Sequence, residues 1–460
     1  MTNSEKTKLE HSQRNQYSNF LIIWIGELVS TIGTGLTGFA LGIYAFNLTG
    51  QATSATMVVL LTFLPAFLLR PFGGVLADRI DRRLLMIVGN LGYALGIGLV
   101  FFVLTTRPGE LWMIYPGIAI SSVFFAVLSP AYKATVTDLV PQELYGKASG
   151  LVQLSGSAQF LLAPLIAGVL MSIVDISYII MLDIITSILS AVAILFVRRT
   201  VKHKITSKEK TEAHFLREMR EGFKAVVINR GIVILITVTS LILFYIGLLQ
   251  ALFTPMGLSF TDPRTLGTAQ SVCAIGMLIS SVIIGMFWSK RKHALVLSVA
   301  LALMGIFYSF IGVVENIWAI IIPGFLFFFT VPFVNSSIEV LIRQNVSNEK
   351  QGRVWSLISV ITNVGAMIAY ATAGFLADRV FNPLLMPDGA LASSFGQIFG
   401  VGPGRGIAFI FFISGLIVVL LSVVIYRSRS ISELDNHIES VVDEGSGAIG
   451  EAVSENKIHS

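Results

Sequence analysis

Five charged side chains interrupt long apolar stretches of this sequence. They are Glu27, Arg70, Lys133, Asp183 and Glu339. A lone charge at the centre of an apolar layer costs about 2.5–3.5 kcal/mol or more, so such residues usually face a cavity or a partner. Loss of water favours the protonated form of a carboxyl group, and a nearby cation favours the charged form. The acids are therefore candidate proton carriers, and the bases are candidate ion-pair partners.

An internal repeat relates two of these charges. Segment 140–151, VPQELYGKASGL, aligns without gaps with segment 346–357, VSNEKQGRVWSL, at an offset of 206 residues. The same offset relates Lys133 to Glu339, which predicts that they lie at equal depth in matching helices. The chance resemblance of two apolar helices is the alternative, and the identities in the polar loops argue against it.

The charges lie on elements that must be membrane-spanning helices. The chain of 460 residues is 54% hydrophobic and only 13% charged, whereas soluble domains carry about 25% charged residues. Continuous apolar runs of about 20 residues indicate helices that cross a bilayer. We expect twelve of them, near 20–46, 51–77, 84–105, 111–137, 146–172, 177–197, 231–256, 266–289, 294–313, 317–342, 353–377 and 404–426.

The basic residues predict the orientation of these helices. Of the 32 Lys and Arg residues, Arg107, Arg264, Arg379 and Arg405 fall on one side, Arg70 and Lys133 lie within spans, and the others lie on the side of the two ends. Loops rich in Lys and Arg face the cytoplasm. We therefore expect both termini in the cytoplasm of a multi-pass protein of the cell membrane.

The repeat and the polar segments predict the domain organisation. A cytoplasmic tail (1–19) precedes a six-helix bundle (20–197), and a second bundle (231–426) follows a linker (198–230) with an amphipathic helix. Residues 427–460 are expected to form a disordered cytoplasmic tail. Two parallel repeats imply an all-α membrane fold with a pseudo-two-fold axis along the membrane normal.

The strongest local motif lies in the tight turn between the second and third spans. It reads Gly74-Val-Leu-Ala-Asp78-Arg79-Ile-Asp-Arg82-Arg83. In spacing and position it resembles the signature of the major facilitator superfamily, although Asp81 stands where that pattern usually has glycine. A similar string, Gly374-Phe-Leu-Ala-Asp378-Arg379, falls at the outer end of span eleven and cannot serve the same cytoplasmic gate.

Within that superfamily the chain is similar to macrolide-efflux and multidrug exporters. The resemblance rests on Trp24-Ile-Gly-Glu-Leu-Val-Ser, on the turn motif and on Leu216-Arg-Glu-Met-Arg-Glu-Gly222, and it covers most of residues 20–426. Span five carries Gly156, Pro164 and Gly168, similar to the motif of proton-coupled exporters. A kinked helix interface made of small residues explains the same pattern, and the two interpretations are compatible.

The resemblance implies secondary active efflux of amphipathic molecules by alternating access, with protons as the coupling ion. It places Glu27, Lys133 and Glu339 on the central path. Glu27 is then the leading proton carrier, Lys133 and Glu339 help to close the inner gate, and Asp78 exchanges partners during gating. Each alternative is a structural role. The buried charges could form static pairs that only fix helix packing, and the turn arginines could serve only to set the membrane topology. Asp183 could be an acid that reaches the membrane interface.

Other function classes find less support in the sequence. No nucleotide-binding glycine loop is present, and no His or Cys has metal-ligand spacing, so we expect no enzyme, cofactor or metal site. Uptake, lipid or siderophore transport by the same fold stays open, as does a non-transporting scaffold or receptor. We expect a monomer in the lipid bilayer with a small-molecule substrate and no nucleic-acid partner.

Overall fold

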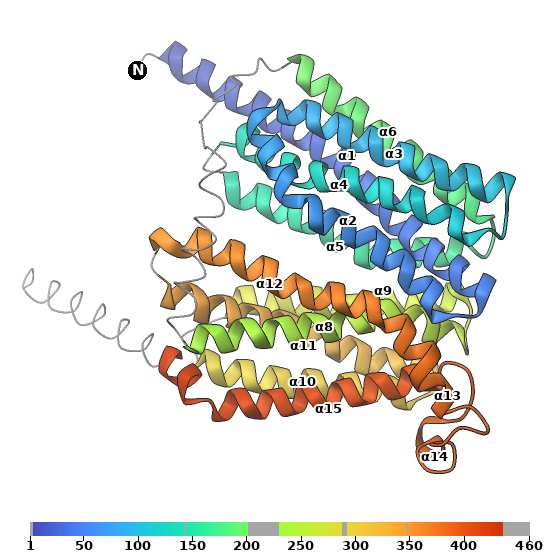
Figure 1. Ribbon diagram of the computed structural model, residues 1–460. Coiled ribbons are helices and arrows are strands. Elements are labelled where there is room, and N and C mark those ends of the chain that lie inside the picture. The colour runs from blue at the N-terminus through green and yellow to red at the C-terminus, as the bar shows by residue number, and fades with distance from the viewer. Residues whose placement is uncertain (1–2, 142–143, 201–229, 288–291, 347, 436–460) are drawn as a thin grey trace, which may run out of the picture.

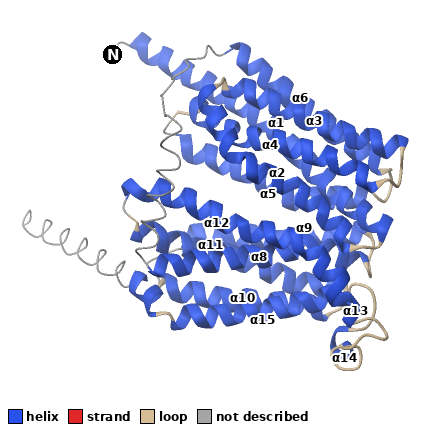
Figure 2. Ribbon diagram, viewed as in Figure 1, coloured by secondary structure: helices blue, strands red, loops and turns tan. Residues whose placement is uncertain are grey.

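The computed structural model describes the chain except for residues 1–2, 142–143, 201–229, 288–291, 347 and 436–460. The described residues form helices joined by loops (Figure 2). Twelve of these helices are long and apolar enough to cross a membrane. The prediction of twelve spans in an all-α membrane fold is thus confirmed.

The helices form two bundles that lie side by side (Figure 1). The first bundle contains α1 (Asn3–Thr49), α2 (Ala52–Arg79), α3 (Arg82–Thr106), α4 (Leu111–Leu139), α5 (Tyr145–Leu170) and α6 (Ile176–Thr200). The second contains α8 (Arg230–Leu258), α9 (Pro263–Phe287), α10 (His293–Val313), α11 (Ile317–Asn345), α12 (Asn348–Phe375) and α15 (Arg405–Arg427). A π-helical turn (Leu376–Phe381) and the short helices α13 (Asn382–Leu384) and α14 (Gly396–Phe399) lie between α12 and α15. We call the end where α1 begins and α15 ends the termini face, and the other end the opposite face.

Glycine allows several helices within a bundle to touch through their backbones. A Cβ atom added to Gly312 of α10 would lie 2.1 Å from the carbonyl oxygen of Ala408 in α15. Between α3 and α4, a Cβ added to Gly96 would lie 2.7 Å from the carbonyl oxygen of Gly117. Small residues at such crossings are typical of membrane helices, where packing rather than water exclusion drives association.

We expect Gly312→Ala to destabilise the protein. The added methyl group must push α15 away, and overpacking of this kind typically costs about 1–3 kcal/mol. Gly98→Ala is the matched control, because a Cβ added to Gly98 meets nothing within 4 Å. Thermal unfolding in one detergent would compare the two variants, and equal stability of both would contradict the close packing of α10 on α15.

The two bundles meet near the opposite face. Gly168 of α5 packs so closely on α9 that an added Cβ would lie 2.6 Å from the carbonyl oxygen of Pro263. The rings of Phe63 in α2 and Tyr370 in α12 stack with centroids 5.5 Å apart. Farther along α2, towards the termini face, Phe72 is 65% exposed. Figure 1 shows the bundles spreading apart in that direction.

The chain ends differ from the expected tails. Helix α1 begins at Asn3, well before the predicted start of span one. Residues 429–435 are helical rather than disordered, with Ile431 and Leu434 buried. The carboxylate of Asp435 accepts hydrogen bonds from the amides of His293 and Ala294, so it caps α10. The predicted start of the disordered tail at residue 427 is therefore wrong, because the chain is helical and packed at residues 429–435. The amphipathic helix in 198–230 and the rest of the tail lie outside the described residues.

The long connection before α15 packs on the second bundle. Leu385, Phe399 and Phe409 form an apolar cluster there. The Arg405 guanidinium, which is 3% exposed, pairs with Glu315 at 3.1 Å. It also lies over the ring of Phe260, 5.3 Å from the centroid. This segment thus covers the end of the second bundle on the opposite face.

Candidate functional site

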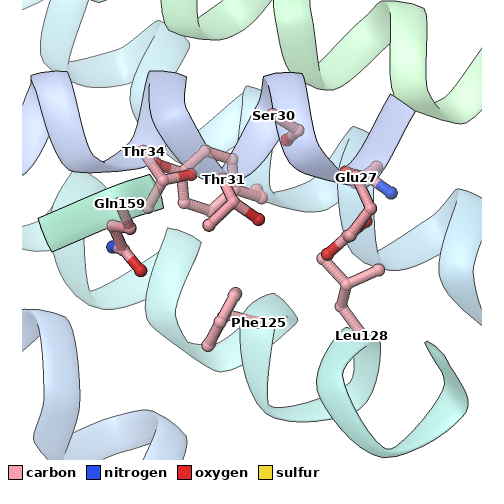
Figure 3. Close-up of a pocket in the computed structure, with 9 residues that line it drawn as sticks. Glu27, Ser30, Thr31, Thr34, Phe125, Leu128 and Gln159 are labelled. Carbon is pink, nitrogen blue, oxygen red and sulfur yellow. The ribbon is translucent and has the colours of Figure 1, made fainter. Parts of the chain in front are cut away.

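Glu27 lines a polar cavity inside the first bundle. Its side chain is 8% exposed and comes from α1. The other residues around the cavity come from α1, α3, α4 and α5. They are Ser30, Thr31, Thr34, Asn90, Tyr93, Phe125, Leu128 and Gln159. Figure 3 shows Glu27 and Thr31 on α1 facing the α4 side chains Phe125 and Leu128, with Gln159 of α5 at one end.

The cavity suits water rather than a drug. Its volume is about 30 Å³, and a cavity of about 10–15 Å³ is enough to hold one water. Within the described part of the chain, Glu27 Oε2 and Asn90 Oδ1 are buried without a hydrogen-bond partner. Buried polar atoms normally have partners. Water molecules in the cavity, or a proton on Glu27 together with water, would satisfy both oxygens.

The direction of Glu27 differs from the expectation. The resemblance placed its carboxyl group on a path between the two halves. The structure instead turns it towards α3 and α4 of its own bundle, where Asn90 and Leu128 line the same cavity. Its burial in an apolar run agrees with the sequence analysis.

Asp183 lies behind the same cavity, on α6. It is fully buried and accepts a hydrogen bond of 2.8 Å from the hydroxyl of Tyr93. Gly33 of α1 makes room for it, because an added Cβ would lie 2.9 Å from Asp183 Oδ1. Asp183 is thus an interior group and not an interfacial acid. Tyr93 lines the same cavity as Glu27 and donates its hydroxyl to Asp183.

The other three intramembrane charges are exposed in this structure. Arg70 of α2, Lys133 of α4 and Glu339 of α11 all lie on accessible surface. Glu339 forms an ion pair with Arg343, one turn farther along its own helix. The expected inner-gate pair of Lys133 and Glu339 is therefore not assembled here, since Glu339 is bound to Arg343 and Lys133 is exposed.

The arginines of the turn motif hold the ends of several helices together. Arg82 bonds to Asp138 at the end of α4, with 2.7 Å between Nη1 and Oδ1, and also to the carbonyl oxygen of Ala77. Asp81, the departure from the family pattern, caps α3 by accepting from the amide of Arg83. It also binds Arg198 of α6 at 2.7 Å. These contacts exceed what topology alone requires.

Two other members of the motif make little contact with the second bundle. A Cβ added to Gly74 would meet nothing within 4 Å. The side chain of Asp78 is 74% exposed and lies 3.7 Å from Arg82. Arg79 is also exposed, while Arg83 is 5% exposed. The motif is therefore anchored to its own bundle and open on the side of Gly74 and Asp78.

The predicted exporter-like residues of α5 separate into two groups. Pro164 and Gly168 lie at the contact with α9, where a Cβ added to Gly267 would approach the carbonyl oxygen of Pro164 to 2.1 Å. Gly156 is exposed and has open space beside it. The interpretation as a small-residue interface thus applies to Pro164 and Gly168 alone.

Glu27 has polar neighbours that are not among the predicted site residues. Thr31 and Thr34 follow Glu27 at four and seven residues, which places all three on one face of α1. This spacing could have revealed them. Asn90, Tyr93 and Gln159 come from other helices, and their proximity depends on the packing of the bundle.

Comparisons with known proteins agree with the geometry. The family model for the Major Facilitator Superfamily matches residues 23–370 and, again, residues 247–443. Macrolide efflux protein A of Streptococcus pyogenes is 28% identical over 371 residues, which cover 78% of this chain and 90% of that protein. Macrolide efflux protein A of Enterococcus faecalis is 27% identical over 313 residues, with coverages of 67% and 96%. The crystal structure of the nucleoside transporter NupG has a TM-score of 0.67 at 15% identity, and the match covers 89% of this chain and all of that one.

Proposed function

The chain belongs to the Major Facilitator Superfamily, within its efflux branch, and we propose that it exports amphipathic small molecules in exchange for protons. It is a multi-pass membrane transporter and not an enzyme. The macrolide-efflux relatives support macrolide-like drugs or natural products as the substrate class. The observation that carries the proton coupling is the unpaired Glu27 oxygen on a water-sized polar cavity.

The proposed orientation places the termini face in the cytoplasm of a cell-membrane protein. The loops at that face carry the basic turn motif, with Arg79, Arg82 and Arg83. Cytoplasmic loops are enriched in Lys and Arg. With this orientation the bundles are joined at the outer face and spread apart at the inner face, which is an inward-open arrangement.

Alternating access then requires the inner contacts to form as the outer contacts break. Lys133 and Glu339 are both exposed near the termini face. When this face closes, they would form an ion pair between the two bundles. On the same side Asp78 is exposed and Gly74 has open space beside it. In the outward-open form Asp78 would accept hydrogen bonds from the facing helix, as the superfamily resemblance implies.

Glu27 is the proposed proton carrier, and Asp183 is the second candidate. A carboxyl group held away from water favours its neutral form, and a bound cationic substrate would favour proton release. Competition between proton and substrate would couple their movements. Tyr93 lines the cavity beside Glu27, and its hydroxyl donates to Asp183, so the two acids share this neighbour.

We expect cells expressing the chain to accumulate less macrolide than cells with an empty vector. A proton uncoupler should raise accumulation to the empty-vector level, because the proton gradient drives export. Radiolabelled or fluorescent macrolide would report both quantities. Export that persists in the presence of the uncoupler would contradict proton coupling. Uptake rather than depletion would contradict the proposed direction.

A further inference from the structure

Two helices that pack against each other from opposite bundles end in nearly the same sequence. Helix α2 ends with Gly-Val-Leu-Ala-Asp-Arg at residues 74–79. Gly-Phe-Leu-Ala-Asp-Arg stands at residues 374–379, where α12 passes into the π-helical turn. The helices are antiparallel, since α2 begins at the opposite face and α12 ends there. Each copy of the sequence therefore lies level with the beginning of the other helix.

The copy on α12 binds the beginning of α2. Asp378 Oδ1 accepts a hydrogen bond of 3.0 Å from the amide of Ala52. Asp378 Oδ2 accepts bonds of 2.7 Å from both the amide and the hydroxyl of Thr53. The first amides of a helix have no partner within the helix and carry partial positive charge, so they favour a carboxylate.

The second bundle thus supplies a cap that α2 lacks. Gln51, which precedes α2, makes no side-chain cap of its own. Three other helices, for example, have a carboxylate or amide cap from their own bundle. Asp81 caps α3 two residues away, Asn316 caps α11 in the same way, and Asp435 caps α10 within the second bundle. The cap from Asp378 crosses between the bundles.

Gly374 makes this approach possible. A Cβ added there would lie 2.3 Å from Thr56 Oγ1 and 2.4 Å from the Cα of Thr53. Any larger residue would separate α12 from α2. Asp378 itself lies in a π-helical turn, Leu376–Phe381, a conformation that is rare and often found at functional positions.

The two copies are in opposite states in this structure. Gly374 and Asp378 are engaged with α2, as their contacts show. Gly74 has open space beside it, and the side chain of Asp78 is 74% exposed. One face is therefore joined through its copy of the sequence while the other face is open.

We propose that Asp378 and Gly374, together with Ala52, Thr53 and Thr56, form an outer latch that must release before the transporter opens at the opposite face. The two copies work reciprocally, with one engaged in each of the two open forms. Water can solvate both Asp378 and the α2 amides after separation, so the latch can break and reform. The inference rests on the proposed alternating-access function. It adds Asp378 as a residue that sets the balance between the two forms.

Cysteine labelling tests the latch on the purified full chain in nanodiscs. Ser271 is buried on α9, one turn from Gly267 at the contact with α5. The substitution Ser271→Cys supplies the reporter thiol. It is made in a Cys273→Ser variant, so that the natural buried cysteine cannot react. Opening at the opposite face exposes this position to a thiol reagent. We expect Asp378→Asn to raise the labelling rate about tenfold, which corresponds to about 1.4 kcal/mol in the opening equilibrium.

Asp388→Asn is the matched control. Asp388 is an exposed acid in the same connection, so the variant makes the same charge change without touching α2. Labelling should stay at the rate of the parent protein. An equal rise in both variants, or a rise in neither, would overturn the latch.

Hydrogen exchange of the wild-type protein gives a second test that needs no variant to fold. The amides of Ala52 and Thr53 should exchange slowly, in contrast to the first amides of a helix without a cap. Rapid exchange at both positions would overturn the proposal. Neither measurement uses a substrate or a gradient. An error in the proposed cargo or coupling ion would therefore leave these results unchanged, while the accumulation assay would fail.

Discussion

Glu27→Gln is expected to abolish gradient-driven export while leaving the protein folded. Glutamine keeps the size and polarity of the side chain, so the cavity can still hold water and Asn90 keeps its surroundings. The amide cannot take up or release a proton in the working pH range. With purified protein in proteoliposomes, macrolide movement driven by an imposed pH gradient should fall to the level of empty vesicles. Binding of the substrate should persist.

The control for this experiment is Glu110→Gln. Glu110 lies in the loop between α3 and α4, next to Arg107 and partly exposed, and its variant should transport like the parent protein. Undiminished export by Glu27→Gln would remove Glu27 from the mechanism. If Asp183→Asn alone lost the gradient response, the proton would be assigned to the Asp183 and Tyr93 pair instead.

Lys133→Glu is expected to reduce export almost completely, because it prevents the termini face from closing. In the closed form the new glutamate would face Glu339, and like charges brought together across an interface cost several kcal/mol. The double variant Lys133→Glu, Glu339→Lys should recover part of the activity. Recovery should be incomplete, because Glu339→Lys removes the partner of Arg343 and puts a second cation one turn away on the same helix. Initial rates of macrolide efflux would report both variants.

A charge reversal elsewhere on the termini face distinguishes a specific pair from a general effect of charge. Lys147 is exposed at the beginning of α5, and Lys147→Glu should leave efflux near the parent rate. Equal losses in Lys133→Glu and Lys147→Glu would indicate disturbed membrane orientation. Failure of the double variant to recover any activity would argue that Lys133 and Glu339 do not meet.

Local sequence predicted the helices and the burial of Glu27 well. The bilayer requires every spanning backbone to be hydrogen-bonded within its own helix, so a long apolar run is sufficient evidence for a span. Acids within such runs usually face the protein interior or a water-filled cavity, as Glu27 and Asp183 do. Both arguments use only neighbours along the chain.

The partners of the buried groups required tertiary structure. Tyr93 and Asp183 are 90 residues apart, and Asp378 is 325 residues from Thr53. Nothing in the local pattern selects these pairs from the other polar residues of the spans. The sequence predicts disorder for residues 429–435 because Ile431 and Leu434 are the large apolar residues of a segment that is otherwise polar. Both side chains join the apolar core of the second bundle, where Leu434 lies against Gly231 at the beginning of α8.

The second copy of the turn sequence shows a different difficulty. Its position in the topology predicts that it serves no inner gate, and the structure places it at the opposite face, where Asp378 binds the beginning of α2. The sequence did not show that α2 and α12 would be antiparallel neighbours. That arrangement places Asp378 against the first amides of α2.

The contact between the bundles at the opposite face is made by Gly168, Gly267, Gly374 and Asp378 with the residues they touch, and none of these four residues lines the cavity beside Glu27. The work of separating these surfaces is therefore the same whichever molecule is being carried. Compounds of very different shape would share one slow step and reach similar maximal turnover. They would differ in the concentration at which transport saturates. Such a transporter can carry chemically different substrates at similar maximal rates.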